Sequence, residues 1–151
     1  MNKAKVLFIM TSAFNPNAGG VQRSTFKLGK YFTEHGMGVS YYSFLTEGHV
    51  HVEYGKLYHS KKKGECAEKE NIADIVRIVR EVKPDFIINN SPYEKELENA
   101  MFTIKKDLGF KFLTCMRTSL YQFKNNPSLR MKYMLPPALY KLSNNFMGIA
   151  F

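Results

Sequence analysis

The sequence predicts an α/β fold in which helices flank a doubly wound, mostly parallel sheet. Short apolar runs, which indicate buried strands, alternate along the chain with amphipathic stretches that indicate helices. The run at 86–88 is apolar without alternation, which is typical of strands buried on both faces of a parallel sheet. The length of 151 residues, the hydrophobic content of 44% and the aromatic content of 14% fit one folded domain.

The first sixty residues predict two clear strands and one helix. Apolar, β-branched and aromatic residues mark the strands. In the helix, apolar side chains recur every three or four residues, and a glycine follows its end. Residues 46–60 are ambiguous apart from one short strand. In chain order, these elements are expected at Lys5–Thr11 (strand), Val21–Glu34 (helix, ended by Gly36), Val39–Phe44 (strand) and Lys56–His59 (short strand).

The second half continues the alternation of helix and strand. Apolar residues at helical spacing predict a helix that Pro84 ends. Ser91 and Glu94 form a capping box that is expected to begin the next helix, with Ser91 as its N-cap. In order, the elements are a helix through Ile72–Val82, a strand at Asp85–Asn90, a helix from Ser91 that Gly109 stops, a strand at Lys111–Met116, weaker helices within 121–142 and an apolar strand at Phe146–Phe151.

Charge is distributed unevenly along the chain, whose formal net charge is +9. After Asp107 no acid occurs, and six lysines and arginines interleave with aromatic residues. Three interpretations of the basic 111–141 segment stay open: a solvated or normally covered face, peripheral contact with anionic lipid, or binding of a phosphate-rich ligand. Nucleic acid is the least favoured partner and is not expected. Cys66 and Cys115 form no CxxC pair, and we expect reduced thiols in the cytoplasm, with Cys115 buried in a strand.

The apolar segments favour neither a membrane-spanning protein nor one with a signal peptide. No apolar run approaches the ~20 residues that a membrane span requires. The run Val6–Met10 is too short for a signal peptide, and no small-residue cleavage site follows it. We therefore expect a cytoplasmic protein, with the inner face of the membrane as a further possible location.

The candidate site begins with the pair Gly19-Gly20, which is expected to lie in a loop just before a helix starts at Val21. Free N–H groups at a helix N-terminus favour a phosphate, and Arg23 would add a cation there. The alternative is a tight turn that needs glycine for its own geometry. Because the GxGxxG pattern and a Walker lysine are absent, neither a nicotinamide cofactor nor a P-loop is expected.

Polar residues follow the later strands at the same predicted edge of the sheet, where parallel sheets bind ligands. Asn89 and Ser91 end one strand and suit sugar hydroxyls, although both have a structural alternative as strand terminus and helix cap. Arg117 follows the next strand and would hold a phosphate or carboxylate, or remain solvated. The four histidines form no ligand pattern and the acids no catalytic pair, so no metal is expected and the catalytic residues stay unknown.

Together these motifs resemble the N-terminal, Rossmann-like domain of family four glycosyltransferases, which have the GT-B fold. The resemblance rests on the strand Val6–Met10, on the glycine motif Gly19-Gly-Val-Gln-Arg23, and on the element Lys83-Pro-Asp-Phe-Ile-Ile-Asn-Asn-Ser91. It implies that Gly19, Gly20, Val21 and Arg23 line a cleft near the donor diphosphate. It also implies that Asn89, Ser91 and the loop Arg117, Thr118 and Ser119 face the acceptor.

The resemblance further implies a two-domain enzyme that moves a hexose from a nucleotide sugar to a cell-envelope saccharide or lipid-linked acceptor, with no other cofactor. Residues 1–151 correspond to the acceptor-side domain, truncated, and the donor-binding domain is absent, so the chain alone is expected to be inactive. One departure is Met116-Arg117-Thr118, where many relatives place a histidine. The alternative from another class is a non-catalytic α/β module that binds an anionic ligand or partner.

Overall fold

The computed structural model describes residues 3–10, 13–44, 51–60, 69–90 and 94–115. The chain divides into two compact units, Met1–Cys115 and Met116–Phe151, and every described residue belongs to the first. The helices expected within 121–142 and the strand expected at Phe146–Phe151 lie outside the described residues. The described elements are β1 (Lys5–Met10), α1 (Gly19–Glu34), β2 (Gly38–Ser43), β3 (Lys56–His59), α2 (Lys69–Val82), β4 (Phe86–Asn89), α3 (Lys95–Leu108) and β5 (Lys111–Thr114).

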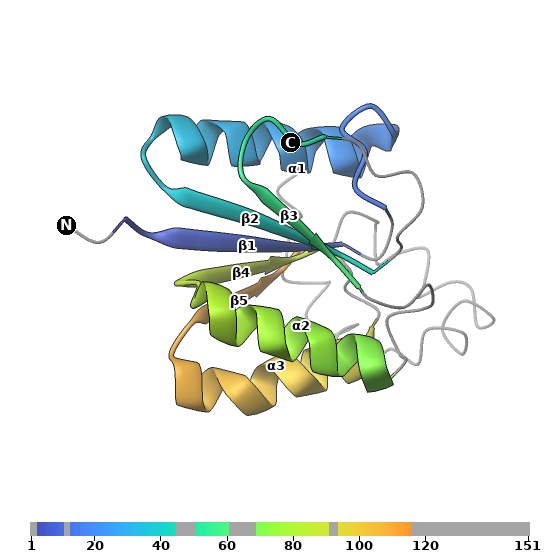
Figure 1. Cartoon of the computed structure of the whole chain (residues 1–151), viewed down its shortest axis with the longest axis vertical. Helices are drawn as coiled ribbons and strands as arrows, with labels where there is room; N and C mark the ends of the chain where they lie inside the picture. Colours follow the sequence, from blue (N-terminus) through green and yellow to red (C-terminus); the bar gives the residue numbers. More distant parts are fainter. Residues whose placement is uncertain (1–2, 11–12, 45–50, 61–68, 91–93, 116–151) are drawn as a thin grey trace, which may run out of the picture. The chain divides into compact units, whose positions relative to one another are not determined.

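The described strands form a single sheet with the order β3-β2-β1-β4-β5, and every neighbouring pair is parallel. The chain therefore moves outward from β1 to β3, returns through α2 to the other side of β1, and continues outward to β5. Helix α1 covers one face of the sheet, and α2 and α3 cover the other (Figure 1). This arrangement confirms the predicted α/β fold with a doubly wound parallel sheet.

Each face of the sheet buries its own apolar cluster, because successive residues of a strand point to opposite faces. In β1, Val6 and Phe8 pack on the α1 side, whereas Leu7 and Ile9 pack against α2 and α3. The five residues Val6–Met10 are all buried, as expected for the central strand of a parallel sheet. The helices contribute Phe26, Leu28 and Phe32 to the first cluster and Ile75, Ile78, Val79, Leu97, Met101 and Ile104 to the second.

Helix α1 lies close to the sheet at Gly29, which is buried against β2. A Cβ atom at this position would overlap the hydroxyl oxygen of Tyr41 on β2, so only glycine fits there without a shift. The ring of Tyr41 stacks on Phe8 at 5.4 Å and on Phe14 at 4.5 Å between ring centroids. The stacked rings of Phe8, Tyr41 and Phe14 therefore connect the apolar cluster on the α1 face of the sheet to the segment that follows β1.

Two predicted helix starts are wrong. Helix α1 begins at Gly19 instead of Val21, with Ala18 as its N-cap. Helix α3 begins at Lys95 with Glu94 as its N-cap, because the first helical hydrogen bond runs from the N–H of Glu98 to the carbonyl of Glu94. The capping box expected at Ser91–Glu94 therefore does not begin the helix.

The predicted helix ends are confirmed. Gly36 and Gly109 adopt left-handed φ angles of +79° and +72°, which favour glycine where a helix stops. Val21 and Leu108, which were expected to face inward, are 37% and 38% exposed because they lie at helix ends beyond the packed centre. Cys115 is also less buried than expected, since it follows β5 and is only partly covered.

Candidate functional site

The candidate site lies at the edge of the sheet formed by the carboxyl ends of the strands. Strands β2 and β4 flank β1 on opposite sides, so the connections that leave β1 and β4 diverge toward opposite faces. In doubly wound sheets, ligands bind outside the carboxyl ends of the strands at this point of divergence. Among the described residues, the segments that follow the strands at this edge are 13–18 after β1, Phe44 after β2, Ser60 after β3, Asn90 after β4 and Cys115 after β5.

The segment 13–18 is held by hydrogen bonds within itself and to the side chain of Gln22 on α1. The side chain of Gln22 accepts a hydrogen bond of 2.6 Å from the N–H of Asn15. Asn15 in turn accepts hydrogen bonds of 2.9 Å from the N–H of Asn17, through its side chain, and from the N–H of Ala18, through its carbonyl. Phe14 is fully buried beneath this turn. The segment therefore presents the start of α1 in a defined position.

The start of α1 is open and lacks a cap. Ala18 has no side-chain acceptor, no side-chain hydrogen bond caps the helix, and its first turn holds no acid. Gly19 and Gly20 are exposed, and a Cβ atom at either position would meet no described atom within 4 Å. Gly19 has a φ angle of +69°, which favours glycine. The first N–H groups of the helix and its positive dipole end thus face an open surface.

Val21 and Arg23, the other residues of the predicted diphosphate site, belong to the first two turns of α1. Val21 is partly exposed, and its carbonyl accepts hydrogen bonds from the hydroxyls of Ser24 and Thr25. Arg23 is exposed and forms no ion pair with a described residue. A guanidinium near a helix N-terminus becomes electrostatically favourable when an anion binds between them.

Asn89, predicted on the acceptor side, is the last residue of β4 and is fully buried. Its carbonyl accepts a hydrogen bond of 2.8 Å from the N–H of Cys115, and Asn90 donates one of 3.0 Å to Ile9, so this part of the edge is firmly paired. Ser91, Arg117, Thr118 and Ser119 lie outside the described residues, and their acceptor-side roles stay predictions.

One polar pair at this edge was missed by sequence reasoning. Thr114, the last residue of β5, donates a hydrogen bond of 3.3 Å to Oε1 of Glu98 in the first turn of α3. Glu98 is partly buried, and this burial raises the pKa of its carboxyl group although the Thr114 hydroxyl opposes the shift. A reading of the βαβ topology could have found the pair, because α3 starts at the edge where β5 ends.

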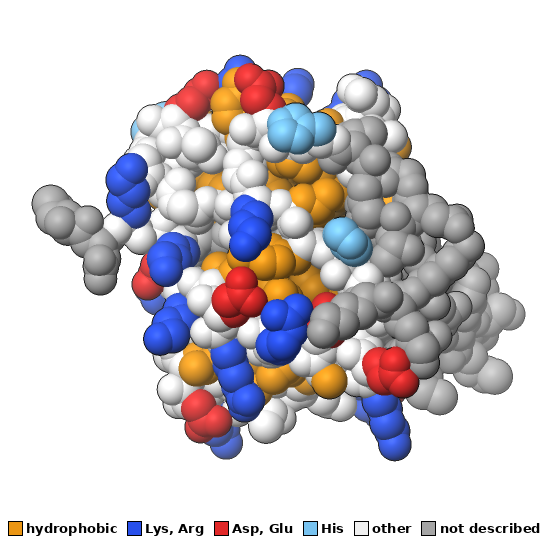
Figure 2. Space-filling model, viewed as in Figure 1, with side chains coloured by type: hydrophobic (Ala, Val, Ile, Leu, Met, Phe, Trp, Pro, Cys, Tyr) orange, Lys and Arg blue, Asp and Glu red, His pale blue; other side chains and the backbone are white. Residues whose placement is uncertain are grey.

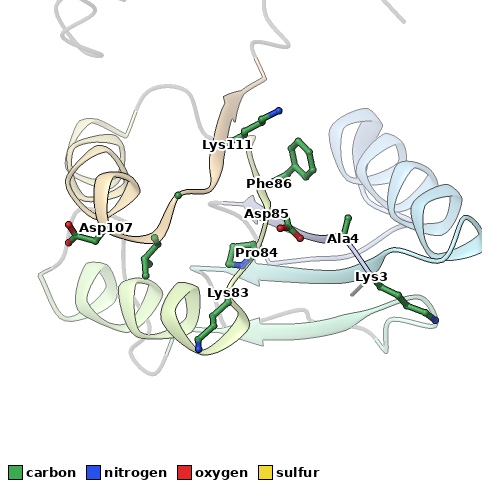
Figure 3. A pocket seen from close by; sticks show the side chains of 10 residues that line it. Lys3, Ala4, Lys83, Pro84, Asp85, Phe86, Asp107 and Lys111 are labelled. Carbon is green, nitrogen blue, oxygen red and sulfur yellow. The ribbon is translucent and has the colours of Figure 1, made fainter. Parts of the chain in front are cut away.

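A hollow of about 670 Å³ lies at the opposite edge, near the amino ends of the strands. In Figure 3, Lys3, Lys83 and Asp107 at its border point away from one another instead of toward a common point. Binding sites need a few convergent polar groups, and this hollow has none among the residues that Figure 3 labels. We therefore assign the candidate site to the carboxyl edge.

Three further observations concern metal ions, membranes and surface charge. Within the described ranges, no group of three or more histidine, cysteine, aspartate or glutamate side chains is placed to hold a metal ion. Within the same ranges, no helix is long and apolar enough to cross a membrane. Figure 2 shows basic and acidic side chains interspersed over one face of the described unit. Of the basic 111–141 segment, only residues 111–115 are described, so its membrane contact stays a prediction.

No protein-family model matches the chain, and no curated protein matches its sequence. Among solved structures, the chain is similar to one described as the crystal structure of a glycosyltransferase from Rickettsia africae ESF-5, with a TM-score of 0.51 and 17% sequence identity. The match covers 83% of this chain and 34% of that chain, so this chain spans about a third of the length of the glycosyltransferase. The likeness concerns the fold, which is similar to that of part of a glycosyltransferase.

Proposed function

We propose that this chain is the acceptor-side lobe of a GT-B glycosyltransferase similar to family four. The whole enzyme would move a hexose from a nucleotide sugar to a cell-envelope saccharide or a lipid-linked acceptor. The observation that carries the proposal is the open, uncapped start of α1 at the carboxyl edge. The likeness of the fold to a glycosyltransferase and the glycine motif of the sequence support it.

In this proposal, the first turn of α1 receives the diphosphate of the donor. The backbone N–H groups of Gly19, Gly20 and Val21 donate to phosphate oxygens, and the absence of a Cβ at the two glycines lets the diphosphate approach the backbone. Arg23 adds a permanent positive charge. Negative charge grows on the diphosphate as the glycosidic bond to the donor breaks, so fixed donors at this position would stabilise the transition state.

The proposal assigns the donor nucleotide to a second lobe that is not part of these 151 residues. A cleft between two lobes would exclude water and align donor and acceptor. The isolated chain is therefore expected to lack transferase activity. The basic 111–141 segment would hold the whole enzyme against the anionic, cytoplasmic face of a membrane, where a lipid-linked acceptor is available.

The test measures sugar-nucleotide consumption by the whole enzyme with Gly20→Val and with the control Gly38→Ala. A side chain at Gly20 meets no described atom, so the fold should persist while the diphosphate is excluded. Gly38 starts β2 at the far edge of the sheet, where a Cβ would make an ordinary contact of 3.4 Å with Lys5. We expect turnover to fall about 10²–10³-fold in Gly20→Val, the loss typical of a removed oxyanion-type contact, and to stay unchanged in Gly38→Ala.

Two results would contradict the proposal in different ways. Turnover of Gly20→Val at the wild-type level would remove the diphosphate role from the glycine turn. An intact enzyme that binds nucleotide sugars without consuming them with any saccharide acceptor would favour the non-catalytic binding module instead. Circular dichroism spectra of each variant show whether a loss of turnover comes from a loss of structure.

A further inference from the structure

Gln22 links the first turn of α1 to the segment that precedes the helix. Its side-chain oxygen Oε1 accepts a hydrogen bond of 2.6 Å from the N–H of Asn15, which lies seven residues earlier in the chain. Asn15 in turn accepts hydrogen bonds from the N–H groups of Asn17 and Ala18, so Gln22 connects the helix to the bonds that hold the turn. The position of the turn relative to the helix start therefore depends on this side chain.

A glutamate at this position would make the same contact. The N–H group of Asn15 requires only an oxygen acceptor, and a carboxylate is a stronger acceptor than an amide. A carboxylate in the first turn would also stabilise the helix through its dipole. The first turn of α1 nevertheless contains no acid, whereas α2 has Glu70 there and α3 has Glu96 and Glu98. The stability of the helix alone therefore does not account for the amide of Gln22.

The amide and the carboxylate differ in their effect on a bound anion. The first N–H groups of α1 have no partner within the helix, and Arg23 directly follows Gln22 and forms no ion pair with a described residue. A carboxylate in place of Gln22 would offset this positive potential and repel a phosphate, whereas the neutral amide leaves the potential in place. The amide therefore combines a fixed turn with an uncompensated positive helix end.

We propose that Gln22 is the positioning residue of the diphosphate site, and that its neutral amide fixes the turn before α1 without repelling the phosphate groups. This inference rests on the proposed function, because it concerns the same first turn of α1. The contacts to the diphosphate are those of the backbone N–H groups of Gly19 and Gly20 and of Arg23. Gln22 acts through Asn15 and through the charge that its amide does not carry.

The test titrates the full 151-residue chain with inorganic pyrophosphate and follows the amide signals of Gly19 and Gly20 by NMR. Gln22→Glu keeps an acceptor for the N–H of Asn15, so this amide should exchange its hydrogen as slowly as in the wild type, and the melting temperature should not fall. The same variant should bind pyrophosphate about fivefold more weakly, the effect of one charge near a helix N-terminus. Gln22→Ala loses the acceptor, so exchange at Asn15 should accelerate and binding should also weaken.

The matched control is Lys30→Gln, which lowers the net charge by one unit, as Gln22→Glu does, but about 15 Å along the helix from Gly20. Solvent and salt screen a charge at this distance, so binding should stay unchanged. If Gln22→Glu binds pyrophosphate as well as the wild type, or loses the slow exchange at Asn15, the role of Gln22 is wrong and the diphosphate site is unaffected. If pyrophosphate does not shift the wild-type signals, the diphosphate site of the proposed function is wrong as well.

Discussion

The phenolic hydroxyl of Tyr42 on β2 donates a hydrogen bond of 3.0 Å to Oδ2 of Asp74 on α2. Arg77, one helical turn further, donates one of 2.8 Å to Oδ1 of the same carboxylate. Tyr42 is fully buried and Asp74 is 7% exposed, so both oxygens of a buried carboxylate are satisfied. This pair fixes the rotation of α2 over the sheet, because another rotation would leave the carboxylate or the phenol without its partner.

We expect Tyr42→Phe to lower the free energy of unfolding by about 1.5–3 kcal/mol, the range for a hydrogen bond to a charged group. Urea denaturation of the chain measures the change. The control is Tyr58→Phe, which removes an exposed hydroxyl 3.5 Å from Glu81 and should change stability little. Equal losses in the two variants would show that the buried carboxylate does not depend on Tyr42.

Tyr41 offers the opposite case, because its hydroxyl is buried and has no hydrogen-bond partner among the described residues. Burial also raises the pKa of this hydroxyl. Since an unsatisfied buried donor costs about 1–3 kcal/mol, Tyr41→Phe should leave stability unchanged or increase it.

Gly29→Ala should destabilise the fold by about 1–3 kcal/mol through overpacking against the ring of Tyr41. The double variant should recover part of the loss, and a strictly additive result in urea denaturation would contradict the contact.

The raised pKa of Glu98 predicts how stability depends on pH. A carboxyl group that is harder to ionise in the folded state binds its proton more tightly there than in the unfolded chain. Its charge therefore opposes folding at neutral pH, and this cost disappears as the pH falls through the folded pKa toward the unfolded value. Glu98→Gln should melt at a higher temperature than the wild type at pH 7, and the difference should shrink on acidification. A difference that grows at low pH would refute the assignment.

The two glycines of the α1 turn should differ in their tolerance of a side chain. Gly19→Ala places a Cβ in a left-handed conformation and should cost about 1–2 kcal/mol of stability. Gly20 has open space and no such φ angle, so Gly20→Ala should be neutral or stabilise the helix by up to about 1 kcal/mol. Thermal melting of both variants checks the order, and a larger loss at Gly20 would contradict the geometry of the turn.

Much of the fold follows from local sequence signals. The centre of every described strand lies inside a predicted one. For β1 and β4 the signal is an apolar run, which is typical of strands buried on both faces, whereas β3 and β5 are largely exposed strands at the edges of the sheet. The helix ends at Gly36 and Gly109 were also predictable, since a left-handed stop needs glycine. The helix starts were predicted less well: α1 already begins at Gly19, and α3 begins with the hydrogen bond from the N–H of Glu98 to the carbonyl of Glu94, after the expected cap Ser91.

The candidate site was only partly predictable for a related reason. The glycine turn is contiguous in sequence, so the chemistry of Gly19 and Gly20 was visible without a structure. The Glu98–Thr114 pair joins residues that are 16 positions apart and becomes apparent only when α3 is placed beside β5. The burial of Asn89 likewise depends on the neighbouring strands, which no local pattern encodes.

Segment 13–18 is held in one conformation before any ligand binds. Its hydrogen bonds and the buried ring of Phe14 fix the backbone there. A ligand that docks on the first turn of α1 meets a backbone whose conformation is already set. Little conformational entropy is then lost on binding, and most of the electrostatic attraction is retained as affinity. If the diphosphate binds there as proposed, Asn15→Ala, which removes the side-chain acceptor of the Asn17 N–H, would reduce affinity by loosening the turn.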